Sequence, residues 1–443
     1  MDALSETGVT LRRAGADDAV AGVVPRWVAL PETTADVAAL MRACAAHDLA
    51  VVPTGEGTKL NWGNPPERCD LLVDTRRLAL EGGAFVEHSP GDLVVRVSAG
   101  LAVNALASFP GFRQELALDN PLPAGTVGGT LATAVAGPRR FRYGTARDLL
   151  IGVTVVLADG TTARSGGRVV KNVAGYDLGK LFCGSYGTLG VITEAVFRLH
   201  PAPRERRWIT VETPASPASE RPATGEGDAL PDTAASPSGL ASPSGLAAPD
   251  AFTALDALAA EFAASQAEPS AVEVDWPGPG GGPTVAALVE GTAAEERARA
   301  VLALADGHGD ARIGEAAPAW WNTLPGDDVL LEARVPPAGT GDAIRAVAVR
   351  GLSARVRGSA ASGVLRVTLP HDVGHEAFAA FVSSMRDDLG RLGGGLTVLA
   401  APYELARGVD RWGPVSALPL MRRVKERFDP DRRMSPGRFV GGI

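Results

Sequence analysis

Val51-Val52-Pro53-Thr54-Gly55-Glu56-Gly57-Thr58-Lys59-Leu60 decides the fold, because it places two alternating glycines directly after a short apolar strand expected at 49–52. Glycines at that spacing let the backbone turn tightly with its N–H groups facing one point, which makes an anion-binding nest. The stretch lacks the GK[ST] of a Walker A loop and is not a G-x-G-x-x-G that opens a long helix, so ordinary NTPase and Rossmann interpretations fail. Taken alone, it is weak evidence for a ligand, and a plain turn stays open.

Two further glycine-rich stretches follow in the same half of the chain. LDNPLPAGTVGGTLAT (118–133) surrounds Thr126 with small residues and then becomes compatible with a helix, and GSYGTLGVI (184–192) leads into a strand. Such loops allow the backbone to approach a flat or phosphorylated ligand closely. Three glycine loops within roughly 140 residues are hard to attribute to turns alone.

Secondary structure around these loops predicts an α+β protein. Apolar periodicity indicates a helix through Val37, Leu40, Met41 and Cys44, and apolar runs predict strands at 70–74, 93–97, 151–157 and 191–199. In the second half the same signals predict helices at 251–264, 295–304, 342–350 and 375–389, and strands at 271–275, 284–290, 329–335, 363–369 and 396–400. This alternation fits a split α/β sandwich with antiparallel pairing.

A low-complexity stretch separates the two halves. Residues 213–250 are rich in Pro, Ser, Ala and Gly, contain a tandem ASPSGL, and have almost no large apolar side chains. They cannot bury enough apolar area to offset their ordering entropy, so we expect a linker or surface loop. The resulting division is an N-terminal extension (1–24), a glycine-rich domain (25–205), a linker (206–250), an α/β domain (251–415) and a C-terminal helix with its tail (416–443).

Composition excludes several classes of function. The net charge of −8 argues against nucleic-acid binding. Cys44, Cys69 and Cys183 lie far apart without a C-x-x-C, which argues against an iron–sulfur cluster, a zinc knuckle or a disulfide framework in this chain. The first residues do not form a signal peptide, and no apolar run is long enough to span a membrane. We therefore expect a cytoplasmic protein that meets a membrane surface only through partners.

The succession of glycine loops resembles the FAD-binding half of the vanillyl-alcohol oxidase / p-cresol methylhydroxylase superfamily, and within it the FAD-binding subunits of bacterial glycolate oxidases. The resemblance covers roughly residues 25–205 and the last 20, and it is carried by the runs PTGEGTKLNWG, DLLVDTRRL, EHSPGDLVVRVSAG, PAGTVGGTLAT, GPRRFRYGTARDLLIGVTVVLADG, SGGRVVKNVAGYDLGKLFCGSYGTLGVITEAVFRLHP and FDPDRRMSPGRF. It implies a p-cresol methylhydroxylase-type FAD-binding domain made of two α/β subdomains, followed by a smaller α/β cap domain with an antiparallel sheet.

The resemblance also implies roles for residues. Pro53, Thr54, Gly55, Glu56, Gly57, Thr58, Lys59 and Leu60 would hold the FAD pyrophosphate. Ala124, Gly125, Thr126, Val127, Gly128 and Gly129, with Thr133, would contact pyrophosphate and the isoalloxazine edges. Gly137, Tyr143, Gly144 and Asp148 would shape the flavin wall, and Gly187, Gly190 and Ile192 would lie near adenine and ribose. Pro121, Ala132, Val191 and Ser435 complete the expected set.

Three positions depart from the family pattern. Glu56 puts a carboxylate beside a predicted diphosphate and must point outward or pair with Lys59, while Ala134 and Ser435 stand where asparagines are common. Some relatives tether the flavin through His or Cys in the first loop. Residues 54–58 carry neither, so the implied FAD is noncovalent.

A substrate site is harder to find in the sequence. His308 and the pair His371 and His375 do not form a full ligand set, so no metal site is expected. Arg139 and Arg142 are candidate clamps for a substrate carboxylate, against the alternative of a solvated basic turn.

The chain thus combines a strong resemblance to FAD-binding loops with no evident substrate or metal site. This contrast leaves three functions open. The first is an FAD-binding oxidoreductase subunit of a glycolate oxidase-type complex, which oxidises a 2-hydroxyacid or relays its electrons, with a second flavin subunit and an iron–sulfur subunit as partners. The second is a free-standing FAD-dependent 2-hydroxyacid dehydrogenase. The third is a non-catalytic assembly subunit that has lost flavin, an alternative kept open by Glu56, Ala134 and Ser435.

Overall fold

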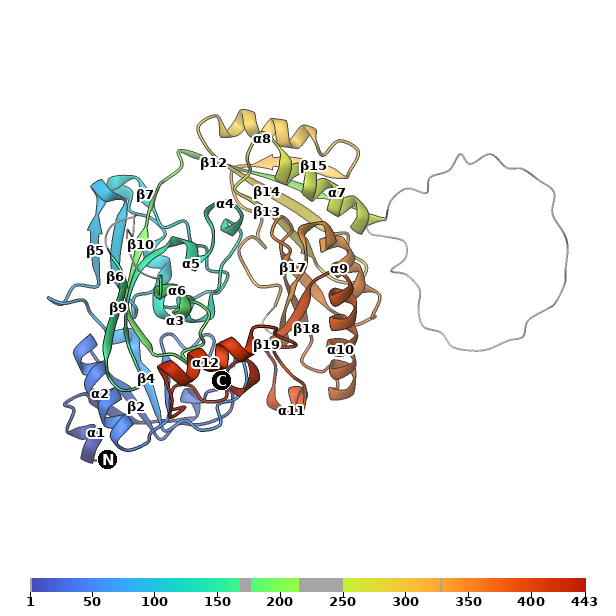
Figure 1. Ribbon diagram of the computed structural model, residues 1–443. Coiled ribbons are helices and arrows are strands. Elements are labelled where there is room, and N and C mark those ends of the chain that lie inside the picture. Colours follow the sequence, from blue (N-terminus) through green and yellow to red (C-terminus); the bar gives the residue numbers. More distant parts are fainter. Residues whose placement is uncertain (1, 168–176, 215–249, 327–328) are drawn as a thin grey trace, which may run out of the picture.

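The computed structural model describes residues 2–167, 177–214, 250–326 and 329–443. The chain forms two lobes, and the C-terminal segment returns from the second lobe to the first (Figure 1). Two smaller sheets build the first lobe, and one large sheet with helices on one face builds the second. The expected α+β class is confirmed by this mixture of helices with mainly antiparallel sheets.

The first sheet carries the strand that leads into the first glycine loop. Its four strands lie in the order β1 (Thr10–Arg13), β2 (Trp27–Leu30), β4 (Leu71–Asp74) and β3 (Val51–Thr54). Thr33 caps the N-terminus of helix α2 (Thr34–Ala46), and its hydroxyl accepts a hydrogen bond from the Asp36 amide. The buried face of α2 packs with Val51 and Leu71 of this sheet and reaches Val156 of the next one, so α2 joins the two sheets. Helix α1 (Asp2–Ser5) contacts α2.

The second sheet supports the other two glycine loops. Its strands are all antiparallel, in the order β5 (Val86–Ser89), β6 (Val94–Ser98), β10 (Val191–Arg198), β8 (Leu150–Val156) and β9 (Thr162–Gly166). Short helices pack on it: α3 (Val127–Thr133), α5 (Ala146–Leu149) and α6 (Gly179–Phe182). Helix α4 (Arg140–Tyr143) lies beside the second lobe, and a small ladder joins β7 (Gln114–Glu115) to β11 (His200–Pro201).

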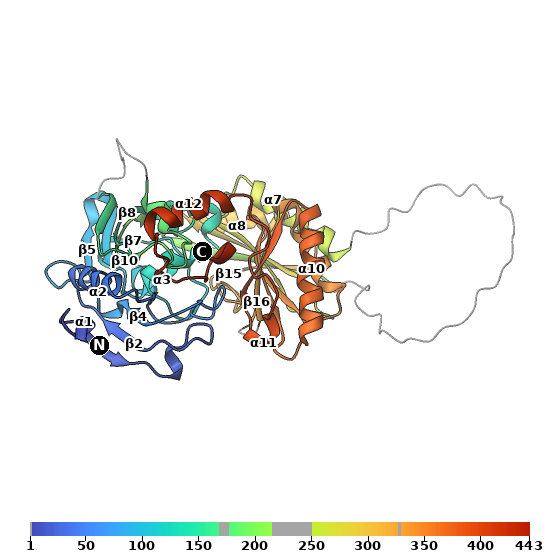
Figure 2. The same ribbon diagram turned by 60° about the horizontal axis from the view of Figure 1, so that its bottom comes forward.

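The second lobe is an eight-stranded antiparallel sheet with one face covered by helices (Figures 1 and 2). Its strands follow the order β15 (Asp310–Gly314), β12 (Glu205–Glu212), β14 (Thr284–Gly291), β13 (Ala271–Trp276), β17 (Arg355–Ser359), β18 (Val364–Leu369), β16 (Val329–Arg334) and β19 (Gly395–Ala400). The helices are α7 (Ala251–Ala264), α8 (Ala294–Ala303), α9 (Thr340–Ala348) and α10 (His375–Arg391).

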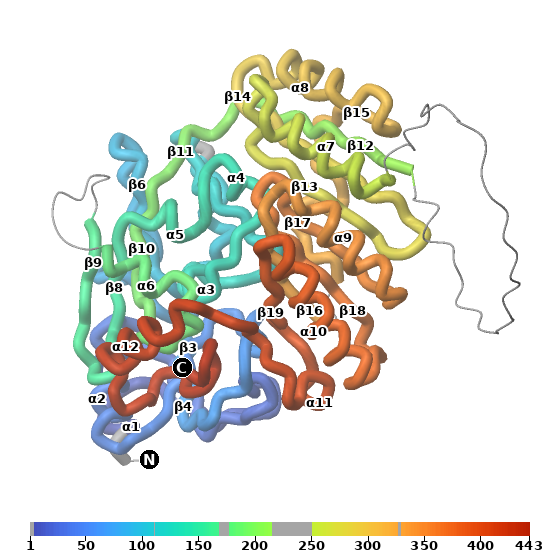
Figure 3. Tube along the Cα trace, turned by 45° about the vertical axis from the view of Figure 1, so that its right-hand side comes forward, coloured from blue at the N-terminus to red at the C-terminus, as the bar shows by residue number. Residues whose placement is uncertain are grey.

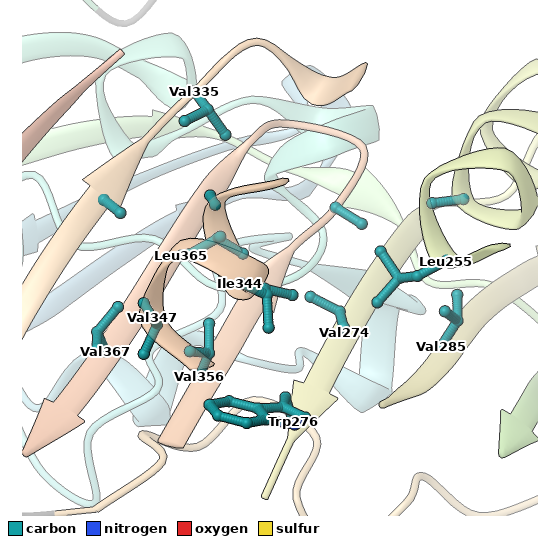
Figure 4. Close-up of a cluster of buried hydrophobic side chains, with 14 of the residues drawn as sticks. Leu255, Val274, Trp276, Val285, Val335, Ile344, Val347, Val356, Leu365 and Val367 are labelled. Atoms are coloured by element: carbon teal, nitrogen blue, oxygen red, sulfur yellow. The ribbon is translucent and has the colours of Figure 1, made fainter. Parts of the chain in front are cut away.

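Alternation along the strands decides which face the helices cover. Val274 and Trp276 of β13, and Leu365 and Val367 of β18, point into the core beneath Ile344 of α9 (Figure 4). Because successive strand residues point to opposite faces, the residues between them point toward the first lobe. Those residues are largely charged.

Strand β12 corrects the expected start of the linker at residue 206. ERRWITVE pairs with β14 on one side and β15 on the other, and Ile209 and Val211 are fully buried. The alternating pattern of Trp208-Ile209-Thr210-Val211 was a strand signal that the neighbouring Pro- and Ser-rich composition obscured. Most of the expected linker, 215–249, lies outside the described residues.

The C-terminal segment binds the first sheet. Helix α11 (Tyr403–Ala406) is followed by α12 (Leu418–Phe428), and the chain then runs beside β3 (Figure 3). The Val51 amide donates to the Arg433 carbonyl at 2.8 Å, and the Ser435 amide donates to the Val51 carbonyl at 2.8 Å. These bonds fix the tail directly next to the first glycine loop. Among the described residues, no helix is long and apolar enough to cross a membrane.

Candidate functional site

The three glycine loops meet around one hollow in the first lobe. This hollow encloses about 740 Å³, counting the part open to solvent. Its lining consists of Pro53, Thr54, Gly55, Glu56, Gly57, Thr58, Lys59, Leu60, Thr75, Thr126, Gly128, Gly129, Ala132, Thr133, Ser185, Tyr186, Gly187, Gly190, Ile192 and Arg438. The structure therefore brings all eight expected residues of the first loop together with members of the other two loops.

Close contacts between the loops require glycine. A β-carbon built on Gly55 would lie 2.1 Å from the Thr126 hydroxyl oxygen, so the first and second loops touch there. At Gly187, where φ is +73°, a β-carbon would lie 3.2 Å from both Pro53 and the Ser435 hydroxyl oxygen, so the third loop touches the first loop and the tail. At these two glycines the loops thus pack against one another without a side chain of the glycine position in between.

Lys59 brings a buried positive charge to this wall. Its side chain is only 9% exposed, and burial lowers its pKa to about 8. The ammonium group contacts the Thr58 hydroxyl at 3.4 Å and forms no ion pair with any described residue. A buried cation without a counter-charge is costly, and an anionic ligand in the hollow would compensate it.

The carboxylate of Glu56 does not supply that counter-charge. Glu56 is exposed, and its charge acts on Arg76, where it contributes to raising the arginine's pKa. Of the two arrangements expected for Glu56, the ion pair with Lys59 is not formed, although Glu56 still lies at the edge of the hollow.

Several expected residues lie outside the hollow. Val127 and Val191 are buried in the cores, Ala124 and Gly125 sit beside the wall without lining it, and Pro121 and Gly137 line a different cavity. The Tyr143 hydroxyl donates to Glu290 at 3.2 Å. Asp148 accepts from the Thr145 amide at 2.7 Å at the start of α5, and the close approach of Gly144 to Asp148 completes that turn. Ser435 is fully buried behind Gly187.

The sequence interpretation missed Thr75, Ser185, Tyr186 and Arg438, which also line the hollow. Arg438 comes from the tail; one of its Nη atoms donates to the Leu60 and Trp62 carbonyls at 3.0 and 2.6 Å, and burial lowers its pKa to about 10. Its run, FDPDRRMSPGRF, already carried the family resemblance, so that resemblance was the available signal.

The expected carboxylate clamp requires correction. Arg139 is buried in a network with carboxylates of this chain, 2.9 Å from Asp119 and 2.7 Å from Glu115. Burial opposes its charge, but these carboxylates together raise its pKa above the ordinary value. Arg142 is exposed and pairs with Glu268 at 3.3 Å. Neither guanidinium lines the hollow.

The described histidines and cysteines have local roles. Within the described ranges, no three His, Cys, Asp or Glu side chains gather as a metal site would require. His375 contacts the Leu405 carbonyl at 2.9 Å, and His308 contacts the Asp306 carbonyl at 3.2 Å. Burial raises the pKa of Cys44, Cys69 and Cys183 to about 12, so their thiols stay protonated at neutral pH.

Comparison with known proteins agrees with this geometry. Residues 25–166 match the family model described as FAD binding domain. The glycolate oxidase subunit GlcD of Bacillus subtilis is 33% identical over 190 residues, which cover 42% of this chain and 39% of that protein. The mitochondrial D-lactate dehydrogenase [cytochrome] 1 of Saccharomyces cerevisiae is 34% identical over 182 residues, 41% of this chain and 30% of that protein. The mitochondrial D-2-hydroxyglutarate dehydrogenase of Bos taurus is 36% identical over 178 residues, 39% of this chain and 31% of that protein.

Solved structures show the same fold. p-Cresol methylhydroxylase with substrate bound superposes with a TM-score of 0.65 at 15% identity, covering 94% of this chain and 89% of that one. Chitooligosaccharide oxidase superposes with a TM-score of 0.64 at 15% identity, covering 98% and 97%. The resemblance drawn from the sequence is confirmed: the chain carries an FAD-binding domain within the p-cresol methylhydroxylase-type fold.

Proposed function

We propose that this chain is the FAD-binding oxidoreductase subunit of a glycolate oxidase-type complex, with FAD held noncovalently in the hollow. One observation carries the proposal: three glycine loops converge on a hollow whose wall contains Lys59, a buried cation that forms no ion pair with any residue the structure describes. The match of residues 25–166 to an FAD-binding domain supports FAD as the ligand.

The residues present fit this cofactor. The N–H groups of the first loop and the Lys59 ammonium would hold the diphosphate. The absence of a side chain at Gly55 and Gly187 lets the ligand lie against backbone. Thr54, Gly55, Glu56, Gly57 and Thr58 offer no imidazole or thiol for a covalent bond, which favours a noncovalent complex.

Bound FAD supplies two-electron redox chemistry, and the protein positions the ligand and excludes water. Thr126 is the N-cap of α3, and its hydroxyl accepts a hydrogen bond from the Gly129 amide at 3.2 Å. This bond orients the second loop. Tyr186, which lines the hollow, stacks on Phe439 and meets Trp412 edge to face, and these contacts hold its ring in place. The three cysteines are protonated and lie far apart, so an iron–sulfur cluster in the proposed complex would belong to a partner chain.

A free-standing 2-hydroxyacid dehydrogenase is the second candidate. The matched relatives include enzymes named for D-lactate and D-2-hydroxyglutarate, and a charged cavity adjoins the hollow. The two candidates differ in whether this chain alone reduces its flavin with a hydroxyacid.

An absorption spectrum of the purified full chain tests the proposal. We expect the two visible bands of an oxidised flavin, with all of the colour released into the supernatant by acid precipitation. Glycolate added first alone and then with partner subunits separates the two enzymatic candidates by whether bleaching needs the partners. A colourless chain that takes up no added FAD would instead support the non-catalytic assembly role.

A further inference from the structure

A separate cavity lies at the β19 edge of the large sheet, beside helix α11 (Figure 1). It encloses about 660 Å³, counting the part open to solvent, and no described residue lines both this cavity and the FAD hollow. The second lobe contributes the end of β19, the start of α11, His371 and Arg411. The first lobe contributes the turn at Ala21 and Gly22, together with Asn61.

A backbone bridge joins the two walls of this cavity. Trp62 of the first lobe pairs in antiparallel fashion with Ala400 at the end of β19. Asn61 directly precedes this bridge and directly follows Leu60, which lines the FAD hollow. A ligand held in the cavity would therefore contact both lobes where they meet.

The backbone around Arg411 is fixed at this edge. The Arg411 carbonyl accepts the Val398 amide of β19 at 2.7 Å. Arg386 of α10 donates to the Asp410 carbonyl at 2.7 Å and to the Leu396 carbonyl at 3.2 Å. These bonds keep the arginine against the sheet, and its side chain is only 4% exposed.

The guanidinium group of Arg411 is a buried cation with an unused donor. One Nη atom donates to the Ala401 carbonyl at 3.0 Å, and the other has no hydrogen-bond partner among the described residues. Burial lowers the pKa of Arg411, and no carboxylate of the described residues offsets this effect. The neighbouring Asp410 carboxylate instead accepts the Trp412 and Gly413 amides, at 3.0 and 3.1 Å. An unpaired buried charge is costly unless a ligand compensates it.

The other polar side chains of the wall favour an anion as that ligand. Asn61, His371 and Tyr403 bring an amide, an imidazole and a phenol to the cavity, and these groups carry N–H or O–H donors. None of the described residues that line the cavity is acidic, although the chain has a net charge of −8. Oxyanions satisfy a buried guanidinium group through short, charge-assisted hydrogen bonds.

We propose that this cavity binds a small oxyanion, a carboxylate or phosphate group, on Arg411, and that the bound anion strengthens the contact between the two lobes. The anion acts as an effector and not as a substrate, because the cavity is separate from the hollow assigned to FAD. The inference is independent of the proposed function, since it follows from a buried charge outside that hollow.

Calorimetric titration of the FAD-saturated full chain tests this site, with inorganic phosphate and acetate as probes at constant ionic strength. We expect a saturable binding step that Arg411→Met weakens at least tenfold. Arg407→Met is the matched control and should bind as the wild type does, because Arg407 is exposed in the same segment and does not line the cavity. The probe that binds more tightly in this step identifies the favoured group, phosphate or carboxylate.

Thermal unfolding gives a second measurement of the same site. An anion that binds the folded chain raises its melting temperature as the anion concentration increases. Arg411→Met should lose this specific rise and keep only the general salt effect, while Arg407→Met should keep both. Without added anion, Arg411→Met should melt at or above the wild-type temperature, because the substitution removes an unpaired buried charge.

Two results would overturn the proposal: wild-type protein that binds neither probe, and Arg411→Met that binds both as the wild type does. If Arg411→Met does not fold, Asn61→Ala and Tyr403→Phe decide, and unchanged binding in both variants overturns the site. If the wild type takes up no FAD, the proposed function fails. The flavin-free chain then still tests the cavity, with Lys59→Met as the background that removes anion binding in the hollow.

Discussion

Gly55 packs so closely against Thr126 that a β-carbon on Gly55 would lie 2.1 Å from the threonine hydroxyl oxygen and 2.6 Å from its methyl group. The two residues come from loops 71 positions apart and form the junction of the hollow. Thr126 cannot simply rotate away, because its hydroxyl accepts the Gly129 amide at the start of α3. The contact therefore fixes the spacing of two loops that we propose to hold one cofactor.

Substitution of Gly55 tests that spacing. In Gly55→Ala, the new methyl group must push the first loop away from Thr126, so we expect at least tenfold weaker FAD binding, measured by quenching of flavin fluorescence. Gly91→Ala is the control, since a β-carbon there meets no atom within 4 Å. Unchanged FAD affinity in Gly55→Ala would show that the cofactor does not depend on this junction.

Lys59 predicts a pH dependence of FAD binding. Its pKa of about 8 in the flavin-free chain means that the ammonium loses its proton above that pH, while a diphosphate favours the charged form. FAD affinity should therefore fall as the pH rises from 7 to 9.5. Lys59→Met should bind FAD roughly tenfold or more weakly at pH 7, since a hydrogen bond to a charged group contributes about 1.5–3 kcal/mol. The variant should also lose most of the pH dependence, which titrations at both pH values would show.

The same lysine affects stability in the opposite sense. Because the folded pKa of Lys59, about 8, lies below the ordinary lysine value of 10.5, the unfolded chain binds more protons between those two values. The free energy of unfolding of the flavin-free chain should therefore gain a contribution as the pH rises from about 8 to 10.5. Urea denaturation of the wild type and Lys59→Met across this range measures it, and equal pH profiles for the two proteins would contradict the buried charge.

The pattern of apolar residues predicted those helices and strands that bury one face. Helix α7 was expected at 251–264 and spans Ala251–Ala264, and the strands expected at 271–275 and 284–290 do pair, as β13 and β14. Apolar periodicity sufficed there because each element buries one face. Strand β17, Arg-Val-Arg-Gly-Ser, was not predicted because Val356 is its one apolar side chain and the strand ends in glycine and serine, so the alternation is too short to be recognised.

Contacts between distant segments limited the prediction of the site. The spacing of the glycines indicated which loops approach a ligand, but it could not show that Arg438 arrives beside Leu60 from 378 positions away. Nor could the basic turn at Arg139 reveal that Glu115 and Asp119 would form ion pairs with that arginine. Side-chain partners of charged residues depend on the packing of the whole chain, and a single sequence does not contain that information in a local pattern.

Ala134 explains one departure from the family pattern in backbone terms. It ends α3 with φ at +53°, and Ser435 likewise has φ at +46°. Asparagine tolerates this left-handed conformation better than other non-glycine residues, so the backbone at both positions would suit the asparagines that the family resemblance implies there. Ala134→Gly should therefore stabilise the chain by about 1 kcal/mol. The control Ala39→Gly, inside α2, should destabilise it by a similar amount. Chemical denaturation measures both, and destabilisation by Ala134→Gly would contradict the strain.

A buried ion pair holds the C-terminal tail in place. We expect its loss to weaken FAD binding in the hollow. The Lys425 ammonium lies 2.7 Å from Asp429 and also donates to the Thr188 and Met434 carbonyls, both at 2.8 Å. Asp429 in turn accepts from the Arg433 and Met434 amides at 3.0 and 2.7 Å. These bonds set the segment whose carbonyl and amide pair with Val51 of β3.

Lys425→Met leaves Asp429 buried without its partner, and we expect a loss of about 3–5 kcal/mol in the free energy of unfolding. Arg423→Met, an exposed position on the same helix, should change it by less than about 0.5 kcal/mol. Because Arg438 and Ser435 follow the ion pair along the tail, Lys425→Met should also weaken FAD binding at temperatures where the chain is still folded. Protease cleavage confined to the tail, together with a flavin titration, would show this coupling. Full FAD affinity in a destabilised Lys425→Met protein would instead show that the hollow keeps its shape without the tail.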